Sequence, residues 1–488
     1  MKTKRVLAFD FGASSGRAMI ATLKDGKIDM KEIHRFANDP VLVGKRLSWD
    51  VLRLFHEIKQ GIVLAVQDGG FDAIGIDTWG VDFGLINKHG ELIGNPANYR
   101  DTRTEGIPEE VFSVVSEQEI YSSAGIQKMN FNTLYQLYYL AKYRPETLEQ
   151  AETALLMPDL FAYFLTGAKR MEYTIASTTN MLDAKAKKIN YELMNKLGIK
   201  SDIFPKMIFP GEAYGNLLPE ICEELHCESV PVIAVPTHDT ASAVYAVPTK
   251  IKDYAYISCG TWSLFGTVVD EPILSEESRL TGFTNEGAKD GKIRYLRNIM
   301  GLWLIQQSRG EWKRQGLNVS FDEMENSARA AEPFKCFINP DASDFVAPGN
   351  MPKRVTEFCK KTGQFVPESM GEILRCIYQS LAMKYRLAIE GMESITGKKY
   401  ECIYMIGGGI KDKLLCQMTA DACGVKVVAG PVEATVTGNI ITQFGAFGLI
   451  ENEEQAKDII IDSTDIKIFL PEGTDEWEKN FENYKKVL

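Results

Sequence analysis

The sequence has no long hydrophobic run, few cysteines and no cluster of basic residues. No apolar segment reaches the length of about 18 residues that a helix needs to cross a bilayer. The nine cysteines all lie from Cys222 onward and form no Cys-x-x-Cys pair, so neither a zinc site nor a disulfide framework is indicated. Lys and Arg number 55 against 66 Asp and Glu. We therefore expect neither nucleic acid nor a membrane as a partner.

A targeting signal is also missing. The first residues, MKTKRVLAFDFG, lead directly into a short apolar segment and a glycine turn, without the apolar core and cleavage site of a signal peptide. We therefore expect a cytoplasmic protein with reduced thiols, as a monomer or a homodimer. A chain of 488 residues, 45% apolar and 25% charged, predicts a folded protein with two large domains.

Two segments share the pattern of a strand, a turn of small residues and a second strand. The first turn is Asp10–Arg17 (DFGASSGR), and the second lies near Thr261 (SCGTWS). The Rossmann and Walker fingerprints need a helix after their glycines, so they do not apply. The backbone N–H groups of such turns can bind phosphate, and Asp10 could hold Mg²⁺; alternatively, Asp10 only caps a tight hairpin. The repeated pattern predicts domains 1–247 and 248–488.

The pair His238 and Asp239 follows an apolar strand at residues 230–235. Ligands bind at the carboxyl ends of strands in open α/β sheets, and a carboxylate there can take a proton from a substrate hydroxyl. Asp239 is therefore a candidate general base. The alternative is that it only caps a helix that begins with the small residues 240–243.

Two further segments have patterns of functional interest. Residues 402–406 predict a buried strand, followed by Gly407–Gly409, a helix over 411–423 and a strand over 425–429, which is typical of a nucleotide-binding βαβ unit. Residues 73–79 predict another strand, which ends at Trp79 and is followed by Gly80. Trp79 is either a core aromatic or one wall of a sugar pocket.

With these segments in order, the chain resembles the FGGY family of carbohydrate kinases. The resemblance spans nearly the whole chain and is carried by the motifs DFGASSGR, IDTWGVDF, YRDTRT, NTLYQL, LLMPD, HDTASAV, SCGTWSL, NIMGLW, GGG, ADACG and GPVEA. It implies an α/β protein of two domains with the actin-like, ribonuclease H-like ATPase fold and a central cleft between them. It also implies transfer of the γ-phosphoryl group of ATP to the primary hydroxyl of a ketose, L-rhamnulose.

The resemblance also implies roles for individual residues. Asp239 would be the catalytic base, and Asp10 is our candidate for the Mg²⁺ ligand. The sugar would be bound by Gly80, His238, Asp239, Thr240 and Asn298. The nucleotide would be bound by Ala13, Ser14, Ser15, Gly16 and Arg17 in the first phosphate loop, by Thr261 in the second, and by Gln306, Gly407, Gly408 and Gly409.

Two positions depart from the common family pattern. His238-Asp239-Thr240 stands where many members carry Gly-Asp-Gln, which argues against glycerol or xylulose as the substrate. Lys411-Asp412 stands where an Asn is common after the glycines. Two rival functions remain: a kinase for another ketose, such as L-fuculose or a ketopentose, and an actin-like ATPase that acts on a protein partner.

Overall fold

The computed structural model describes residues 4–488, which form two compact units. Unit 1 contains the described residues up to Lys250 together with Val268–Tyr295 and Ala434–Thr464. Unit 2 contains Ile251–Thr267, Leu296–Glu433 and Asp465–Leu488. Each unit is therefore assembled from several segments of the chain. The division of the sequence into domains 1–247 and 248–488 stays a prediction.

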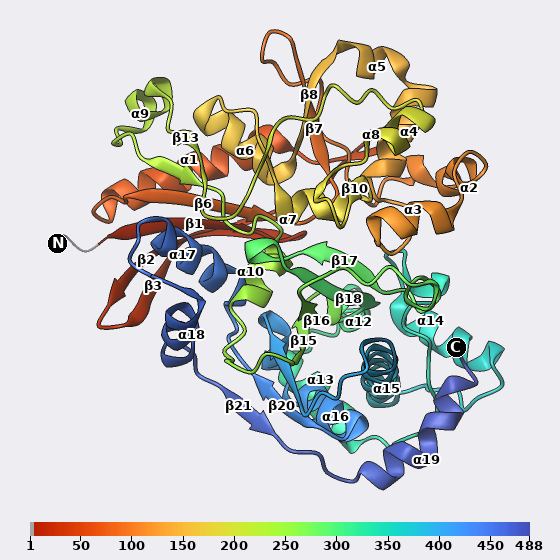
Figure 1. The fold of residues 1–488 in the computed structure, drawn as a ribbon. Coiled ribbons are helices and arrows are strands. Elements are labelled where there is room, and N and C mark those ends of the chain that lie inside the picture. Colours follow the sequence, from red (N-terminus) through yellow and green to blue (C-terminus); the bar gives the residue numbers. More distant parts are fainter. Residues whose placement is uncertain (1–3) are drawn as a thin grey trace. The chain divides into compact units, whose positions relative to one another are not determined.

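A six-stranded sheet forms the centre of unit 1 (Figure 1). Strands β1 and β6 are parallel, and β1 and β2 are antiparallel, so the first predicted strand-turn-strand segment is confirmed. In order across the sheet the strands are β13 (Ala213–Asn216), β14 (Pro231–Ile233), β6 (Ala73–Thr78), β1 (Arg5–Phe11), β2 (Ser15–Lys24) and β3 (Lys27–Ala37).

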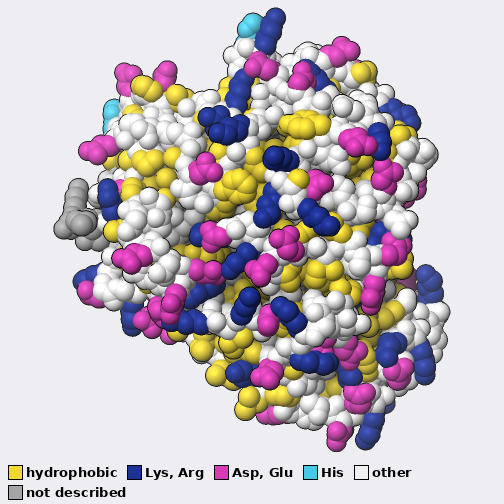
Figure 2. All heavy atoms as spheres, in the orientation of Figure 1, with side chains coloured by type: hydrophobic (Ala, Val, Ile, Leu, Met, Phe, Trp, Pro, Cys, Tyr) yellow, Lys and Arg dark blue, Asp and Glu magenta, His cyan; other side chains and the backbone are white. Residues whose placement is uncertain are grey.

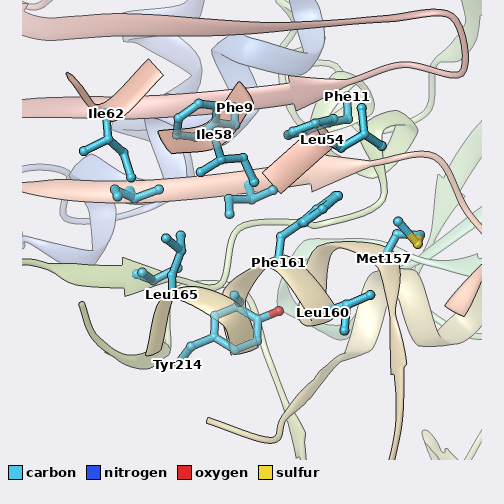
Figure 3. Packing of buried hydrophobic residues seen from close by; sticks show 14 of the residues in the cluster. Phe9, Phe11, Leu54, Ile58, Ile62, Met157, Leu160, Phe161, Leu165 and Tyr214 are labelled. Carbon is cyan, nitrogen blue, oxygen red and sulfur yellow. The ribbon is translucent and has the colours of Figure 1, made fainter. Parts of the chain in front are cut away.

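Helices cover both faces of this sheet because its central strands are apolar on both sides. On one face, Phe9 and Phe11 pack with α1 (Val51–Gln67) and α6 (Met157–Thr166), and the rings of Phe11 and Phe161 stack 5.0 Å apart (Figure 3). Val6 and Ala8, which alternate with these residues, pack with α17 (Ala434–Ala446).

A second large sheet has seven strands. The pair β15 and β16 is antiparallel, whereas β15, β19 and β20 run parallel to one another, which confirms both the second strand-turn-strand segment and the predicted βαβ unit. In order the strands are β17 (Thr284–Gly287), β18 (Ile293–Met300), β16 (Trp262–Val269), β15 (Ala255–Cys259), β19 (Cys402–Ile406), β20 (Lys426–Ala429) and β21 (Lys467–Phe469).

The long helix α15 (Met370–Thr396) lies in the core of unit 2. Its start is stabilised by a capping box, in which Ser369 and Glu372 satisfy each other's backbone N–H groups. The other helices of this unit are α12 (Trp303–Arg314), α13 (Phe321–Ala330), α14 (Met351–Lys361), α16 (Lys413–Cys423) and α19 (Thr474–Lys485), with the 3₁₀ turns η4 (Ser343–Phe345) and η5 (Gly408–Lys411).

The remaining elements belong to unit 1. The helices are α2 (Ile107–Phe112), α3 (Glu117–Ala124), α4 (Thr133–Tyr143), α5 (Pro145–Gln150), α7 (Tyr173–Ala176), α8 (Tyr191–Lys196), α9 (Pro219–Leu225), α10 (Asp239–Tyr245), α11 (Glu276–Leu280) and α18 (Glu453–Asp462). The short strands are β4 (Val41–Val43), β5 (Arg46–Ser48), β7 (Phe83–Asn87), β8 (Ala151–Leu156), β9 (Met171–Glu172), β10 (Leu182–Asp183), β11 (Lys188–Ile189) and β12 (Met207–Ile208). The 3₁₀ turns are η1 (Thr102–Thr104), η2 (Ser177–Thr179) and η3 (Lys289–Gly291).

Surface charges are mixed on the face in Figure 2, where Lys and Arg side chains alternate with Asp and Glu. Within residues 4–488, every helix is too short or too polar to cross a membrane. The nine cysteines are all free thiols.

Candidate active site

Ser14 and Ser15 are exposed residues in the turn between β1 and β2. Its shape is held by hydrogen bonds from the Gly12 amide to the Ser15 carbonyl (2.9 Å) and from the Asn38 side chain to the Gly12 carbonyl (2.8 Å). Arg17 lies opposite Asp10 in the β-ladder and donates from Nε and Nη2 to Asp10 Oδ2, at 3.0 and 2.8 Å. The carboxylate of Asp10 therefore pairs with an arginine as well as starting the turn.

Asp10 lies beside a second acidic residue that the sequence analysis did not single out as a ligand. Asp77 on β6 is its partner in the parallel ladder, and its side chain is fully buried. Asp77 Oδ2 accepts a hydrogen bond from Asn439 on α17 at 2.6 Å, whereas Oδ1 has no hydrogen-bond partner within residues 4–488. Burial and then the negative charges of Asp10 and Asp239 hold the pKa of Asp77 well above its usual range.

Asp239 opens α10, as the alternative predicted, but as the first helical residue; the N-cap position is His238. Its Oδ1 accepts hydrogen bonds from the backbone and hydroxyl of Thr240, and its side chain remains 28% exposed. Burial and the charge of Asp10 raise the pKa of Asp239, while His238 and Thr240 oppose the shift. A partly exposed carboxylate with a raised pKa is suited to accept a proton.

The loop before His238 is anchored by a buried glutamate, Glu172. Its Oε2 accepts hydrogen bonds from the backbone of Thr237 (3.1 Å) and from the Thr237 hydroxyl (2.5 Å). The Thr78 amide at the end of β6 donates to the Thr237 carbonyl at 2.9 Å. These bonds attach the loop to β6 and to Glu172 of β9, and His238 is bridged to Thr78 at the end of β6.

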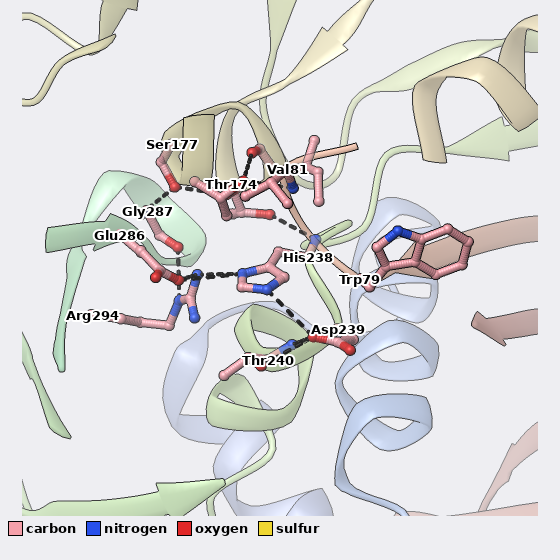
Figure 4. Close-up of polar contacts among 12 residues, drawn as sticks. Trp79, Val81, Thr174, Ser177, His238, Asp239, Thr240, Glu286, Gly287 and Arg294 are labelled. Carbon is pink, nitrogen blue, oxygen red and sulfur yellow. Dashed lines mark hydrogen bonds and ion pairs between the residues drawn. The ribbon is translucent and has the colours of Figure 1, made fainter. Parts of the chain in front are cut away.

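His238 contacts two charged residues that the sequence analysis missed (Figure 4). Its Nδ1 lies 2.9 Å from Nη2 of Arg294 and 3.4 Å from Oε2 of Glu286. Arg294 also pairs with Glu286 at 3.0 Å and donates from Nε to the Gly287 carbonyl at 2.9 Å. On the other side of the ring, His238 Nε2 lies 3.4 Å from Oδ1 of Asp239. For Arg294 the only signal in the sequence is that β18 (IRYLRNIM) carries two arginines, Arg294 and Arg297, within an apolar run.

Gly80 lies against the same histidine. A Cβ atom at this position would come within 3.4 Å of His238 Nε2 and 3.2 Å of the Thr178 hydroxyl. Trp79, the residue before Gly80, is 5% exposed, and its indole N–H donates to Asp82. In Figure 4 its ring points away from His238. Trp79 is therefore a core aromatic, which was the first of its two predicted roles.

In unit 2, the turn with Thr261 lies against the glycine turn. A Cβ atom on Gly409 would come within 2.4 Å of Cys259 Sγ, so these backbones approach closely only because the residue is glycine. The start of α12 joins them, since the Leu302 amide donates to the Gly260 carbonyl at 3.0 Å. Gln306 is exposed on this helix, and Gly408 has open space where a side chain would be.

Two further residues of unit 2 concern the sugar and the nucleotide. Asn298, on β18, is partly exposed. Asp412, which stands where the family often has Asn, caps α16 by accepting from the Leu415 amide at 3.0 Å and also accepts from the Tyr378 hydroxyl. The helix therefore begins at Lys413, two residues later than predicted.

Two acidic residues of unit 1 would suit a divalent cation. Asp10 and Asp77 are partners in the β-ladder and carry carboxylate oxygens, the donor type that Mg²⁺ prefers. The Oδ1 atom of Asp77 is buried without a hydrogen-bond partner among the described residues, and burial, followed by the negative charges of Asp10 and Asp239, raises the pKa of Asp77. A cation would relieve this repulsion.

This architecture is that of an α/β phosphotransferase with two strand-turn-strand segments and a carboxylate at the end of the sheet. The N-terminal domain model of the FGGY family of carbohydrate kinases matches residues 5–246, and the C-terminal domain model matches residues 255–447. The chain belongs to the FGGY family of carbohydrate kinases. It is a sugar kinase, and the family uses ATP.

Relatives and solved structures agree with this assignment. The chain is 40% identical to a rhamnulokinase of Bacteroides thetaiotaomicron over 99% of each chain, and 41% identical to a rhamnulokinase of Oceanobacillus iheyensis over 94% of this chain and 97% of the relative. It has the fold of a xylulose kinase from Lactobacillus acidophilus, with a TM-score of 0.82 at 17% identity, covering 99% of this chain and 97% of that one. The two-domain α/β kinase fold is thereby confirmed.

Proposed function

We propose that this enzyme transfers the γ-phosphoryl group of ATP to the primary hydroxyl of L-rhamnulose, as a step of rhamnose catabolism in the cytoplasm. The substrate is supported by the rhamnulokinases that the chain resembles over nearly its whole length. The chemistry is supported by one observation in the structure: a partly exposed carboxylate, Asp239, lies at the end of a sheet beside His238 and two further carboxylates.

Asp239 accepts the proton of the sugar hydroxyl while the hydroxyl oxygen attacks the γ-phosphorus of ATP and ADP leaves. Gly80, His238, Thr240 and Asn298 orient the sugar, and the lack of a side chain at Gly80 leaves space beside the histidine. Positioning and charge neutralisation account for most of the catalysis of phosphoryl transfer, so a single base with well-placed neighbours is sufficient.

The nucleotide is held by backbone donors and small residues. Ala13, Ser14, Ser15, Gly16 and Arg17 bind phosphate oxygens, as do Thr261 and the turn Gly407–Gly409, with Gln306 nearby. Asp10 and Asp77 would hold Mg²⁺, which neutralises phosphate charge when it is bound. Arg17 then has two roles, as a phosphate ligand and as the partner of Asp10.

A panel of ketoses tests this proposal. We expect L-rhamnulose to give the highest kcat/KM among L-rhamnulose, L-fuculose, L-ribulose and D-xylulose in a coupled assay for ADP release, and ³¹P NMR to show a phosphomonoester on the primary carbon. A higher kcat/KM for another ketose would reject L-rhamnulose as the substrate, but not the assignment of the enzyme as a sugar kinase.

The rival function of an actin-like ATPase that acts on a protein partner is not favoured, because the chain matches carbohydrate kinases over both halves. ATP turnover that is independent of any sugar would reverse this conclusion.

A further inference from the structure

The pair Arg294 and Glu286 lies behind His238, on the side of the ring away from Asp239. Arg294 is fully buried and Glu286 is 5% exposed. Burying charges carries a large desolvation cost even when they are paired, and hydrophobic residues of similar size often serve the fold as well. The chain nevertheless places both charges against the ring of one histidine.

The hydrogen bond from Arg294 determines which ring nitrogen carries the proton. A guanidinium group has only donors, so at 2.9 Å from Arg294 Nη2 the Nδ1 atom of His238 must accept. Glu286 would favour the opposite tautomer, but it lies farther away, at 3.4 Å, and its charge is paired with Arg294 at 3.0 Å. The proton of the neutral ring therefore lies on Nε2.

Nε2 is the atom that faces the reacting groups. It lies 3.4 Å from Asp239 Oδ1 and close to Gly80. A ring with its proton on Nε2 can donate to an oxygen of the sugar and to Asp239, whereas the other tautomer would present a lone pair to the carboxylate.

We propose that Arg294 is a positioning residue that holds His238 in the Nε2–H tautomer, with Glu286 as its counter-charge, so that His238 acts as a hydrogen-bond donor to the sugar. This proposal rests on the proposed function for the sugar, but the tautomer itself does not. It adds two residues, from β17 and β18, to the machinery around the base (Figure 4).

Histidine NMR tests the tautomer without substrate. The chain has five histidines, so the ring signals of ¹⁵N-histidine-labelled enzyme are few, and the His238→Asn variant identifies the signal of His238. We expect Nε2 protonated and Nδ1 bare in the wild-type enzyme. A proton on Nδ1, or on both nitrogens, would overturn the proposal whether or not L-rhamnulose is the substrate.

Variants separate the two charged residues. In Glu286→Gln, Arg294 still donates, so the tautomer should stay on Nε2. In the double variant Arg294→Met with Glu286→Leu, which removes both buried charges together, we expect a mixture of tautomers and a fall in kcat/KM for the sugar of about tenfold to a hundredfold, mainly through KM. Arg279→Met, which removes a partly exposed arginine paired with Glu117 and Glu276, is the control for the loss of a paired arginine elsewhere in unit 1.

The outcomes of these experiments distinguish control of the His238 tautomer by Arg294 from control by Glu286. A tautomer that changes in Glu286→Gln would make the glutamate the controlling residue and reject the role of Arg294. An unchanged tautomer in the folded double variant would also reject it. If the double variant does not fold, the wild-type and Glu286→Gln spectra still decide.

Discussion

The buried carboxylates of unit 1 differ in how many donors they receive. Asp82 accepts from the indole N–H groups of Trp49 (2.6 Å) and Trp79 (3.1 Å), and from Tyr99 and Gln136. Asp77, by contrast, has one donor, from Asn439. Asp82, with four donors, links Trp49, Trp79, Tyr99 and Gln136 in the core. Asp77, with one donor, keeps an oxygen that can bind a cation.

Asp82 should make stability depend on pH. Burial is the main cause that raises its pKa from 3.8 to about 6, against the hydrogen bonds that favour the charged form. The folded state therefore binds the proton more tightly than the unfolded state. Its contribution to stability is complete below about pH 4 and is lost as the pH rises through about 6, for a total of about 3 kcal/mol.

Urea unfolding of wild type and Asp82→Asn between pH 4 and 7 measures this effect. The variant should lack this part of the decline in the free energy of unfolding, so that the wild-type value minus the value of the variant is about 2.4 kcal/mol larger at pH 4 than at pH 7. Parallel curves would show that Asp82 does not titrate in this range.

Candidate site residues could be named from the sequence where they lie near the end of an apolar run. Asp10, within β1, and Asp239, six residues after β14, were singled out in this way, and their roles stay predictions. Arg294 and Glu286 were not singled out, because they reach His238 from strands about 50 residues later in the chain, and local patterns contain no information about such contacts. Asp77 was not singled out for the same reason, since its one hydrogen-bond donor, Asn439, comes from α17.

At the scale of elements, both strand-turn-strand segments and the βαβ unit were predicted because they are local. Their period, glycines and turn residues all lie within about 30 residues. The packing of α17 on β1 was not predictable, because an apolar helix with small residues fits many surfaces. The contact of the Gly409 turn with Cys259 is likewise a tertiary feature.

That contact gives a prediction for Gly409→Ala. The new methyl group would lie 2.4 Å from Cys259 Sγ and 2.7 Å from its carbonyl oxygen, so the two turns must separate. We expect the free energy of unfolding to fall by about 1–3 kcal/mol, and KM for ATP to rise. Denaturant unfolding and steady-state kinetics measure the two effects.

Gly310→Ala is the control for this change. Gly310 lies within α12, and a Cβ atom there would meet its nearest neighbour, Arg314, only at 3.9 Å. Alanine should leave the stability unchanged or raise it by up to about 1 kcal/mol. Equal stability of Gly409→Ala and wild type would contradict the close packing of the two turns.

At the scale of the whole molecule, the compact units are not continuous in sequence. Unit 1 includes Val268–Tyr295 and Ala434–Thr464. The second of these segments carries α17, whose Val436, Ile440 and Phe444 pack with residues of β1. Burial of an apolar side chain contributes about 1.5–3 kcal/mol to the free energy of unfolding. Loss of all three side chains would therefore remove an amount comparable with the total stability of a domain.

A fragment of residues 1–247 should therefore fail to fold on its own. We expect it to aggregate or to lack a cooperative unfolding transition by circular dichroism. A chain in which residues 1–250 are joined by flexible linkers to 268–295 and 434–464 should recover the transition. A sharp transition in the short fragment would show that unit 1 does not need α17.

The role of Asp239 as the base is the central claim, and the turnover of Asp239→Asn with L-rhamnulose, ATP and Mg²⁺ tests it most directly. Asp202→Asn, on the surface with a side chain 76% exposed, is the control. We predict that kcat falls about 10²–10⁴-fold in Asp239→Asn, because general-base help is lost, that calorimetry shows nearly unchanged ATP binding, and that the control keeps full activity. Unchanged turnover in Asp239→Asn would contradict the account.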